Sequence, residues 1–230
     1  MTSPSISHFS LNTLGRDWVV GDIHGHFTKL EDRLSQCGFN PTYDRLFSVG
    51  DLVDRGPESA RVLEWLDYPW FHPILGNHEE MLVLYTTGQW PESNYIANGG
   101  EWFVALSEDE RLTIASRLVK LPLAIDIETR NGKVGLIHAN TWIDDWENLE
   151  ASLQGNPQGK DNQQELLWGR MRLHGKITAP MKGVWAVFCG HTPVKERTIL
   201  GNFHYIDTGA WAKPAPFRFF NVETLLEVLP

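Results

Sequence analysis

The sequence predicts an α/β fold, a sandwich of two mixed β-sheets flanked by helices. Three short apolar segments, residues 17–20, 46–49 and 71–75, each end at a glycine that polar side chains follow. Segments with helical spacing separate them, so this part of the chain is expected to form a βαβαβ unit with a parallel sheet. Two turn signals, Asn131-Gly132 and Gly201-Asn202, predict antiparallel hairpins further along the chain. Parallel and antiparallel pairs together indicate a mixed sheet and are compatible with two sheets that pack face to face.

Apolar spacing and capping residues place the helices. Phe27, Leu30 and Leu34 share one face, and Gly38 marks the end of that helix. Pro57 suits a first helical turn, and a Ser-Glu-Asp-Glu capping box opens the last helix of this group. We expect helices over residues 27–37, 57–66, 79–86 and 107–120.

The second half of the chain is richer in strands. We expect strands over residues 123–128, 134–138, 187–189, 198–200 and 203–206. Residues 89–102 are expected to be irregular, and residues 140–182 are polar and poorly periodic, with a short helix over 163–171. We find no linker or repeat. We therefore expect a flexible N-terminal arm over residues 1–15 and a single domain over residues 16–230.

The bulk composition excludes several classes of function. The 230 residues carry a net charge of −9, so the basic footprint of a nucleic-acid binder or of an anionic-membrane binder is absent. The two cysteines, Cys37 and Cys189, suit unpaired buried thiols in a reducing compartment. The chain starts without a signal-peptide pattern and has no apolar run of membrane-spanning length, so we expect a cytoplasmic protein. The oligomeric state is left open, and a monomer is compatible with the sequence.

Six polar side chains follow apolar segments at the points where strands end. They are Asp22, His24, Asp51, Asn77, His138 and His191. An isolated histidine after an apolar strand is more often a packing or surface residue. Six such side chains in one repeated pattern instead indicate a site, because parallel strands present their carboxyl ends, where ligands bind, at one edge of a sheet.

These side chains are metal-ligand types. Carboxylate, imidazole and amide-oxygen ligands together suit Mn, Fe or Zn. Six ligands are more than one ion with open positions needs, so we expect two divalent ions bridged by one carboxylate, with Mn²⁺ first and Fe or Zn as alternatives. Such an ion pair clamps the attacking and leaving oxygens of a phosphoryl displacement.

The motifs together resemble a known family. GDIHG at residues 21–25, GDLVDRG at 50–56, GNHE at 76–79 and GHT at 190–192 resemble the PPP-type metallophosphoesterases. NGGEWF at 98–103, WGR at 168–170 and YIDTGA at 205–210 resemble their bacterial and bacteriophage lambda-type serine/threonine protein phosphatase branch. The resemblance runs from residue 18 to residue 209. It implies a metallophosphoesterase-like sandwich and one catalytic domain over residues 16–230.

The resemblance also implies roles for individual residues. Asp22 and His24 would hold the first ion, Asp51 would bridge both ions, and Asn77, His138 and His191 would hold the second. A hydroxide bridging the ions would attack phosphorus directly. His78 would be the general acid, with Asp54 orienting its ring. Arg55 and Arg170 would bind the phosphoryl oxygens. Asn140 departs from the family pattern of Asp or Gly, which leaves the metal set intact.

Three functions are compatible with these motifs. The first is a metal-dependent phosphatase acting on phosphoserine and phosphothreonine, with phosphotyrosine left open, in a phosphorylated protein or peptide. The second is a symmetrical dinucleoside tetraphosphate hydrolase, which shares most motifs but carries Asn at the position of Asp54. The third is a non-catalytic phosphate-binding module, which would be expected to have lost ligands, whereas none is missing here.

The remaining histidines and tryptophans are expected to lie outside the site or in packing roles. The histidines are His8, His26, His72, His174 and His204. For Trp142, Trp146 and Trp168, packing is favoured over a place in a substrate groove. Asp126 and residues 108–110 are expected on a solvated face.

Overall fold

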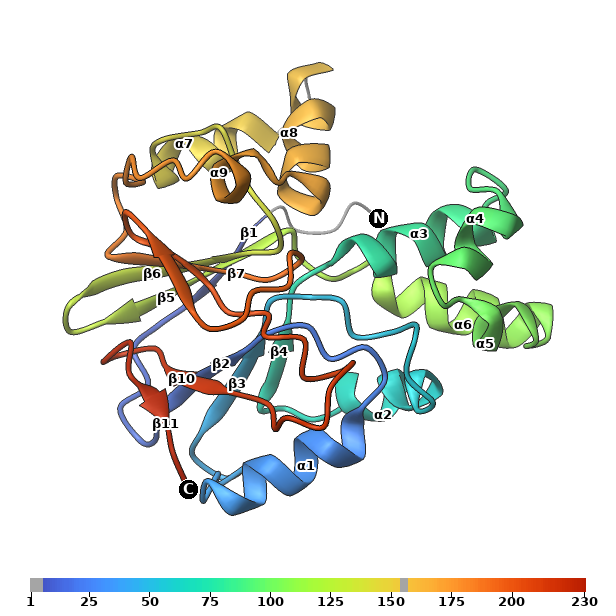
Figure 1. The fold of residues 1–230 in the computed structure, drawn as a ribbon, viewed down its shortest axis with the longest axis horizontal. Helices are drawn as coiled ribbons and strands as arrows, with labels where there is room; N and C mark the ends of the chain where they lie inside the picture. The colour runs from blue at the N-terminus through green and yellow to red at the C-terminus, as the bar shows by residue number, and fades with distance from the viewer. Residues whose placement is uncertain (1–5, 154–156) are drawn as a thin grey trace.

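The computed structural model describes residues 6–153 and 157–230 of the chain. Two mixed β-sheets lie against each other and helices surround them (Figure 1). The expected α/β sandwich of two mixed sheets is therefore confirmed.

The larger sheet has six strands in the order β1-β5-β6-β7-β9-β8. Its strands are β1 (Ile6–Phe9), β5 (Ala124–Thr129), β6 (Gly132–Ile137), β7 (Ala186–Cys189), β8 (Thr198–Leu200) and β9 (Phe203–Tyr205). Both predicted hairpins, β5–β6 and β8–β9, are antiparallel. The pairs β1–β5, β6–β7 and β7–β9 are parallel.

The smaller sheet has five strands in the order β11-β10-β2-β3-β4. Its strands are β2 (Asp17–Val20), β3 (Arg45–Ser48), β4 (Phe71–Pro73), β10 (Phe219–Asn221) and β11 (Glu227–Val228). Strands β2, β3 and β4 are parallel, with Val20 beside Ser48 and Ser48 beside Pro73. Because the three strands end level, the loops that follow them meet at one edge of the sheet.

The helices form three groups around the sheets. They are α1 (Phe27–Gln36), the 3₁₀ helix η1 (Ser59–Arg61), α2 (Val62–Leu66), α3 (Asn77–Thr86), α4 (Glu92–Ala97), α5 (Glu101–Val104), α6 (Glu108–Leu118), α7 (Trp146–Leu153), α8 (Pro157–Trp168) and α9 (Met171–His174). Figure 1 shows α1 and α2 beside the smaller sheet and α7–α9 near the larger one. Helices α3–α6 extend to one side as a lobe. Among the described residues, no helix is long and apolar enough to cross a membrane.

Apolar side chains of both sheets form the core between them. Val19 and Phe47 of the smaller sheet pack in one cluster with Ile125, Leu136 and Phe188 of the larger sheet, and all five are almost fully buried. Successive strand residues face opposite sides of a sheet, so the neighbours of Val19 and Phe47 face the helices instead. The two sheets are thus held at a fixed relative position, which matters because the site takes residues from both.

The expectation of a flexible arm over residues 1–15 is wrong for Ile6–Phe9. These residues form β1, which pairs with β5 from Ile6 opposite Ala124 to Phe9 opposite Ile127. Ile6 is buried, and Phe9 packs edge-on against Phe47 at 5.0 Å between ring centroids. Partners more than 100 residues away order this strand, so its own composition does not reveal it. Residues 1–5 lie outside the described residues.

Helices replace part of the chain that was expected to be irregular. Residues 89–102 contain α4 and the start of α5, and the helix expected over 163–171 is instead α8, which ends at Trp168. Helix α3 begins at Asn77, two residues earlier than expected, and Pro57 precedes the helical residues rather than opening them. Short helices of four to six residues have too few turns to show periodicity in the sequence.

Asp126 does not lie on a solvated face, as was expected, but is buried on β5. Its carboxylate accepts hydrogen bonds from the indole N–H of Trp146 at 3.0 Å, and it lies 2.9 Å from His8 Nδ1. Lys133 Nζ is 3.5 Å away. These partners compensate for the loss of water around the charge.

The fold predicts an acid-sensitive stability. Burial, with a smaller contribution from the charge of Arg197, lowers the pKa of His204 on β9 to about 4, whereas an unfolded chain binds that proton near pH 6.5. The unfolded state therefore binds more protons between about pH 6.5 and 4, and stability should fall through this window, by up to about 3 kcal/mol from this residue. We expect His204→Phe to flatten the dependence of the unfolding free energy on pH.

The measurement is urea unfolding at pH 7.5, 6 and 5 for the parent, His204→Phe and the exposed control His174→Phe. An equal slope in the parent and in His204→Phe would show that His204 does not contribute to the acid sensitivity.

Candidate metal centre and active site

Five of the predicted site residues lie on loops with an unusual backbone. His24, Asp51, Asp54, Arg55 and His191 all have positive φ angles, of 44°, 51°, 69°, 66° and 64°. Non-glycine residues rarely adopt this conformation, and residues held in it are concentrated at functional sites. The loops after β2, β3 and β7 are therefore shaped to direct these side chains into one place.

Asp51, His138 and His191 form one group of potential metal ligands. One ligand atom from each lies within 4.8 Å of the others, and all three residues are buried. The Oδ1 atom of Asn77 faces both rings, 2.9 Å from His138 Nε2 and 2.8 Å from His191 Nδ1. His138 Nδ1 lies 2.6 Å from the carbonyl of Val49, which fixes the ring so that Nε2 faces the group.

A second group shares Asp51. His24 Nε2 lies 3.6 Å from Asp51 Oδ2, and His78 Nε2 lies 4.0 Å from the same oxygen. His24 Nδ1 lies 2.9 Å from the carbonyl of Val53, so its Nε2 is the atom directed inward. The two groups meet at Asp51, one at each of its carboxylate oxygens.

The structure places Asp22 beside these groups rather than within either of them. Both of its carboxylate oxygens lie 3.1 Å from the backbone N–H of His191. Burial, together with the charges of Asp207 and Asp51, raises the pKa of Asp22 well above its ordinary value. A buried carboxylate that resists ionisation beside other carboxylates is suited to a nearby cation, whose charge would offset the repulsion.

The state of the His191 ring also fits the binding of divalent ions by these side chains. His191 Nε2 is buried and has no hydrogen-bond partner among the described residues. Burial lowers the pKa of His191 to about 3, so this ring is neutral at physiological pH and offers a lone pair. Neutral imidazoles around an ionised carboxylate are the ligand state that metals require.

Glu79 is a functional residue to which the sequence analysis assigned no role. Its carboxylate accepts backbone hydrogen bonds from Gly76 at 2.9 Å, Asp51 at 2.9 Å, Leu52 at 2.7 Å and Val53 at 3.2 Å. It therefore ties the start of α3 to the loop that carries Asp51. Burial and the charge of Asp51 raise the pKa of Glu79 to about 7. Glu79 is the last residue of the GNHE motif, so the motif pointed to it. The backbone N–H groups that it binds in the loop after β3 could be identified only from the structure.

His78 and Asp54 form a buried pair next to the shared carboxylate. His78 Nδ1 lies 2.8 Å from Asp54 Oδ2, and both side chains are almost inaccessible to water. Burial disfavours a charge on His78, but Asp51 and Asp54 outweigh it and raise the pKa of His78 above its ordinary value. The ring is thus able to hold a proton near neutral pH.

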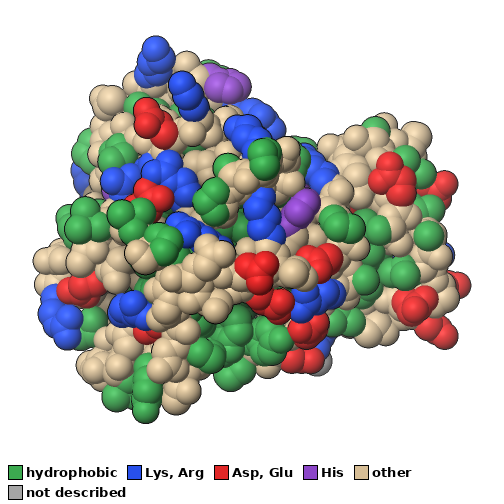
Figure 2. Space-filling view, turned by 60° about the horizontal axis from the view of Figure 1, so that its bottom comes forward, with side chains coloured by type: hydrophobic (Ala, Val, Ile, Leu, Met, Phe, Trp, Pro, Cys, Tyr) green, Lys and Arg blue, Asp and Glu red, His purple; other side chains and the backbone are tan. Residues whose placement is uncertain are grey.

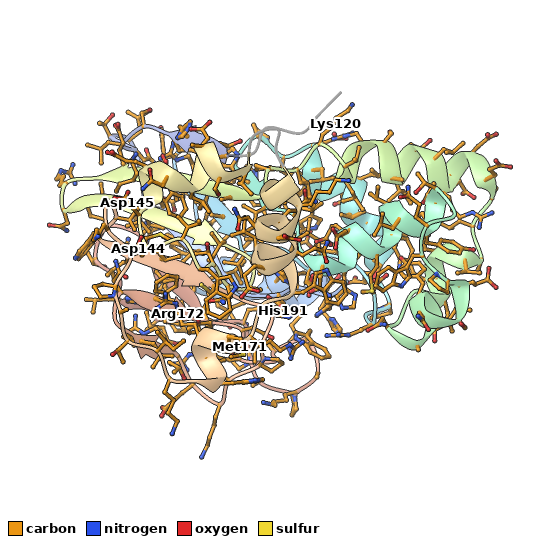
Figure 3. The ribbon with its side chains drawn as sticks, turned by 90° about the horizontal axis from the view of Figure 1, so that it is seen from above. Lys120, Asp144, Asp145, Met171, Arg172 and His191 are labelled. Atoms are coloured by element: carbon orange, nitrogen blue, oxygen red, sulfur yellow. The ribbon has the colours of Figure 1, made fainter. Side chains whose placement is uncertain are left out.

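The two predicted arginines lie near different histidines of the site. Arg55 donates to His24 Nε2 at 2.8 Å and to His78 Nε2 at 2.9 Å, and its guanidinium lies over the ring of Trp211 at 4.5 Å. Arg170 is exposed between α8 and α9. Figure 3 labels the adjacent Met171 together with His191. The charge of Arg170 is among the causes, after burial, that lower the pKa of His138.

Asn140 faces α8 rather than the two groups. Its amide donates a hydrogen bond to Glu165, and its Oδ1 atom is buried without a partner among the described residues. Glu80 accepts from Trp168 Nε1 at 2.7 Å and from Gln164 at 2.9 Å. These contacts hold the end of α8, and with it the start of the segment that carries Arg170.

The residues assigned to other roles stay outside the two ligand groups. The five remaining histidines, at positions 8, 26, 72, 174 and 204, belong to neither group. Trp146 is buried, which supports packing, whereas Trp142 is more than half exposed. Trp168 stacks on Trp90 with centroids 5.8 Å apart and reaches the ring of His191 at 6.3 Å.

The fold and the site agree with a comparison to known families. The model of the calcineurin-like phosphoesterase family matches residues 16–215, and the chain belongs to this family. It is 35% identical over 196 residues to serine/threonine-protein phosphatase 1 of Salmonella typhimurium, which covers 84% of this chain and 86% of the relative. It is 37% identical over 202 residues to serine/threonine-protein phosphatase 2 of Escherichia coli, covering 84% and 87%. The resemblance to the bacterial PPP-type branch is confirmed.

Two proteins named as dinucleoside tetraphosphatases share fewer identical residues with this chain. A crystal structure of a candidate diadenosine tetraphosphatase has the same fold, with a TM-score of 0.65, 21% identity and 96% of both chains covered. A symmetrical bis(5'-nucleosyl)-tetraphosphatase of Coxiella burnetii is 40% identical, but over 81 residues only, 34% of this chain and 27% of the relative.

The geometry around Asp51 predicts the behaviour of a metal-binding variant. Because one of its oxygens faces each group, Asp51→Asn should weaken both positions and reduce bound Mn²⁺ well below two ions per chain. Elemental analysis after dialysis against Mn²⁺ measures this, with the exposed Asp144→Asn as control. Two ions per chain in the parent and in Asp51→Asn alike would contradict the bridging position.

Proposed function

We propose that the protein is a metal-dependent phosphoprotein phosphatase that hydrolyses phosphoserine and phosphothreonine in a phosphorylated protein or peptide. The observation that carries the proposal is the buried His78–Asp54 pair next to Asp51, the carboxylate that both groups of potential ligands share. A proton donor next to a two-ion site is what the cleavage of an alkyl phosphate ester requires. The names of the relatives that match most of the chain support the same class.

Six residues would hold two divalent ions. Asp22 and His24 would hold the first, Asn77, His138 and His191 the second, and Asp51 both. When bound, the ions lower the pKa of water to supply the nucleophile and neutralise the phosphoryl group. The mixture of imidazole, carboxylate and amide oxygen supports Mn²⁺, with Fe or Zn as alternatives.

The chain's own residues bind and protonate the substrate. Arg55 and Arg170 hold phosphoryl oxygens from two sides, since guanidinium forks match phosphate geometry. Local arginines are needed because the chain carries a net charge of −9, and acidic and basic side chains are interspersed on the face that Figure 2 shows. His78 gives its Nε2 proton to the leaving oxygen, and Asp54 keeps its ring in place. In this structure Arg55 contacts Nε2 of His78 and of His24. It would therefore have to move before His78 could donate this proton and His24 could bind an ion.

Asp54 favours the phosphatase over dinucleoside tetraphosphate hydrolysis. A serine alkoxide is a poor leaving group and needs a proton, whereas a nucleotide phosphate leaves with much less help. The ligand groups and the buried acid pair weigh against the third alternative, a non-catalytic phosphate-binding module. We also propose one catalytic domain over residues 16–230 and a cytoplasmic location, which the two unpaired buried cysteines support.

The first test of the function is an assay of the purified protein with Mn²⁺ on a phosphoserine peptide and on diadenosine tetraphosphate. We expect hydrolysis of the peptide and little cleavage of the dinucleotide. Preferential cleavage of the dinucleotide would move the assignment to the hydrolase class.

The arginines generate a second prediction. Arg55→Ala and Arg170→Ala should each lower kcat/KM about 10²-fold, because each removes a charged contact in a partly desolvated site. Inorganic phosphate should inhibit both variants more weakly than the parent. Arg130→Ala, an exposed arginine on the β5–β6 turn, is the control. Equal inhibition of all four proteins would exclude the phosphate-binding role.

The general acid generates a third prediction, which depends on the leaving group. His78→Asn should lower kcat on a phosphoserine peptide by about 10²- to 10⁴-fold but affect p-nitrophenyl phosphate much less, because nitrophenolate leaves almost unaided. Asp54→Asn should show the same selectivity more weakly. Rates are compared at saturating Mn²⁺ and equal metal content. The same fractional loss on both substrates would mean that another group donates the proton.

A further inference from the structure

Helices α4 and α5 dock on the loop that carries Asp54 and Arg55. The backbone N–H of Arg55 donates to the carbonyl of Gly99 at 3.1 Å. A Cβ atom on Gly99, which has φ +95°, would lie 2.6 Å from the Arg55 nitrogen. Only glycine allows the turn between α4 and α5 to approach this closely. The loop that carries Asp54 and the α4–α5 turn therefore pack together as one unit.

Two aromatic side chains of this unit donate to the same oxygen of Asp54. The hydroxyl of Tyr95 donates to Asp54 Oδ1 at 2.9 Å, and the indole N–H of Trp102 donates to it at 2.8 Å. The other oxygen, Oδ2, faces His78 Nδ1 at 2.8 Å. Asp54 is fully buried, so these three donors take the place of water around its charge.

The position of the Tyr95 hydroxyl is itself fixed by packing. Tyr95 is fully buried and stacks on Tyr85 with centroids 5.2 Å apart. A Cβ atom on Gly100 would lie 2.6 Å from the Tyr95 ring, so the backbone also closes against that ring. Burial, followed by the charge of Asp54, raises the pKa of Tyr95, which keeps the hydroxyl protonated and donating.

We propose that Tyr95 and Trp102 are positioning residues of the phosphatase reaction, which act through Asp54 on the proton donor His78. By holding Oδ1 at two points they fix the carboxylate plane, so that Oδ2 faces His78 Nδ1 and His78 Nε2 faces the reacting phosphate ester. The hydrogen bond that each of these side chains makes in the site goes to Asp54 and not to a proposed metal ligand. The inference rests on the proposed function, since it assumes that His78 is the general acid.

The same contacts explain why a carboxylate is needed at position 54. Three donors converge on this side chain, and a carboxylate has two accepting oxygens. The amide of an asparagine has one. If that oxygen accepted from Tyr95 and Trp102, the NH₂ group would face His78 Nδ1, which would have to accept and could not carry a proton. Tyr95 and Trp102 therefore match a carboxylate at position 54, whose second oxygen holds the Nδ1 proton of His78.

Tyr95→Phe tests the proposal, with Tyr85→Phe as a matched control. The control loses the hydroxyl of the stacked neighbour, which bonds to Glu92 and not to Asp54. At saturating Mn²⁺ we expect Tyr95→Phe to lower kcat about tenfold on a phosphoserine peptide and less than about threefold on p-nitrophenyl phosphate, the effect of one hydrogen bond to a charged group. Trp102→Phe should behave in the same way, and Tyr85→Phe should match the parent.

A double-mutant cycle separates positioning from a general effect on the fold. In the Asp54→Asn background, Tyr95→Phe should change the peptide kcat by less than about twofold, because the group on which it acts is altered. The same tenfold loss in both backgrounds would overturn the proposal. So would a loss of equal size on the two substrates.

A spectroscopic measurement on the metal-free protein does not depend on activity. The His78 Nδ1 proton, hydrogen-bonded to Asp54, should give a downfield ¹H resonance. It should shift or broaden in Tyr95→Phe and Trp102→Phe and stay in place in Tyr85→Phe. One outcome would reject the positioning role while leaving the proposed function intact. In that outcome Asp54→Asn shows leaving-group selectivity, but Tyr95→Phe has the same His78 resonance as the parent and the same ratio of kcat on the peptide to kcat on p-nitrophenyl phosphate. If Asp54→Asn shows no selectivity, the general acid of the proposed function fails, and an unshifted resonance would then reject the positioning contacts as well.

Discussion

The Glu79 carboxylate, which accepts four backbone N–H groups, is the interaction on which the site depends. It joins the start of α3 to the loop after β3, and Asp51 sits in that loop with a positive φ angle. A side chain at such a position is directed correctly only if its neighbours hold the backbone. The backbone N–H of His78 donates to Asp51 Oδ1 at 3.0 Å, so α3 and the loop hold each other from both sides. Asn77, His78 and Asp51 are thereby placed together.

The geometry of the site depends, secondly, on the packing between the two sheets. Asp51 follows a strand of the smaller sheet, whereas His138 and His191 follow neighbouring strands of the larger one. The distance between these ligands is therefore set by the cluster of Val19, Phe47 and the residues packed on them, not by local sequence. A change of side-chain volume in that cluster would alter the spacing of the site without touching a ligand. The packing of the core between the sheets therefore determines the geometry of the potential metal ligands.

Much of this arrangement could be predicted from the sequence, and the limits have physical causes. The strand-end positions of Asp51, His138 and His191 were predictable because each follows a short apolar segment of the sequence, but the packing of two sheets that brings them together was not. The pairing of β1 with β5 and the burial of Asp126 were not, because both depend on partners distant in the chain. Tyr95 and Trp102 were missed for the same reason: each reaches Asp54 across more than 40 residues. Which of the family motifs contact one another is a tertiary property, so the motif letters alone could not assign these partners.

The left-handed backbone at Asp54 and Arg55 has a consequence for protein engineering. A non-glycine residue in this conformation costs roughly 1–2 kcal/mol, and two occur in succession here. Glycine at either position would relieve that strain while removing a side chain that the proposed reaction requires. Directed evolution for heat resistance alone would therefore tend to select inactive proteins from this loop. A library that holds residues 51–55 constant and varies the helical lobe or the outer strands would separate thermal tolerance from loss of turnover.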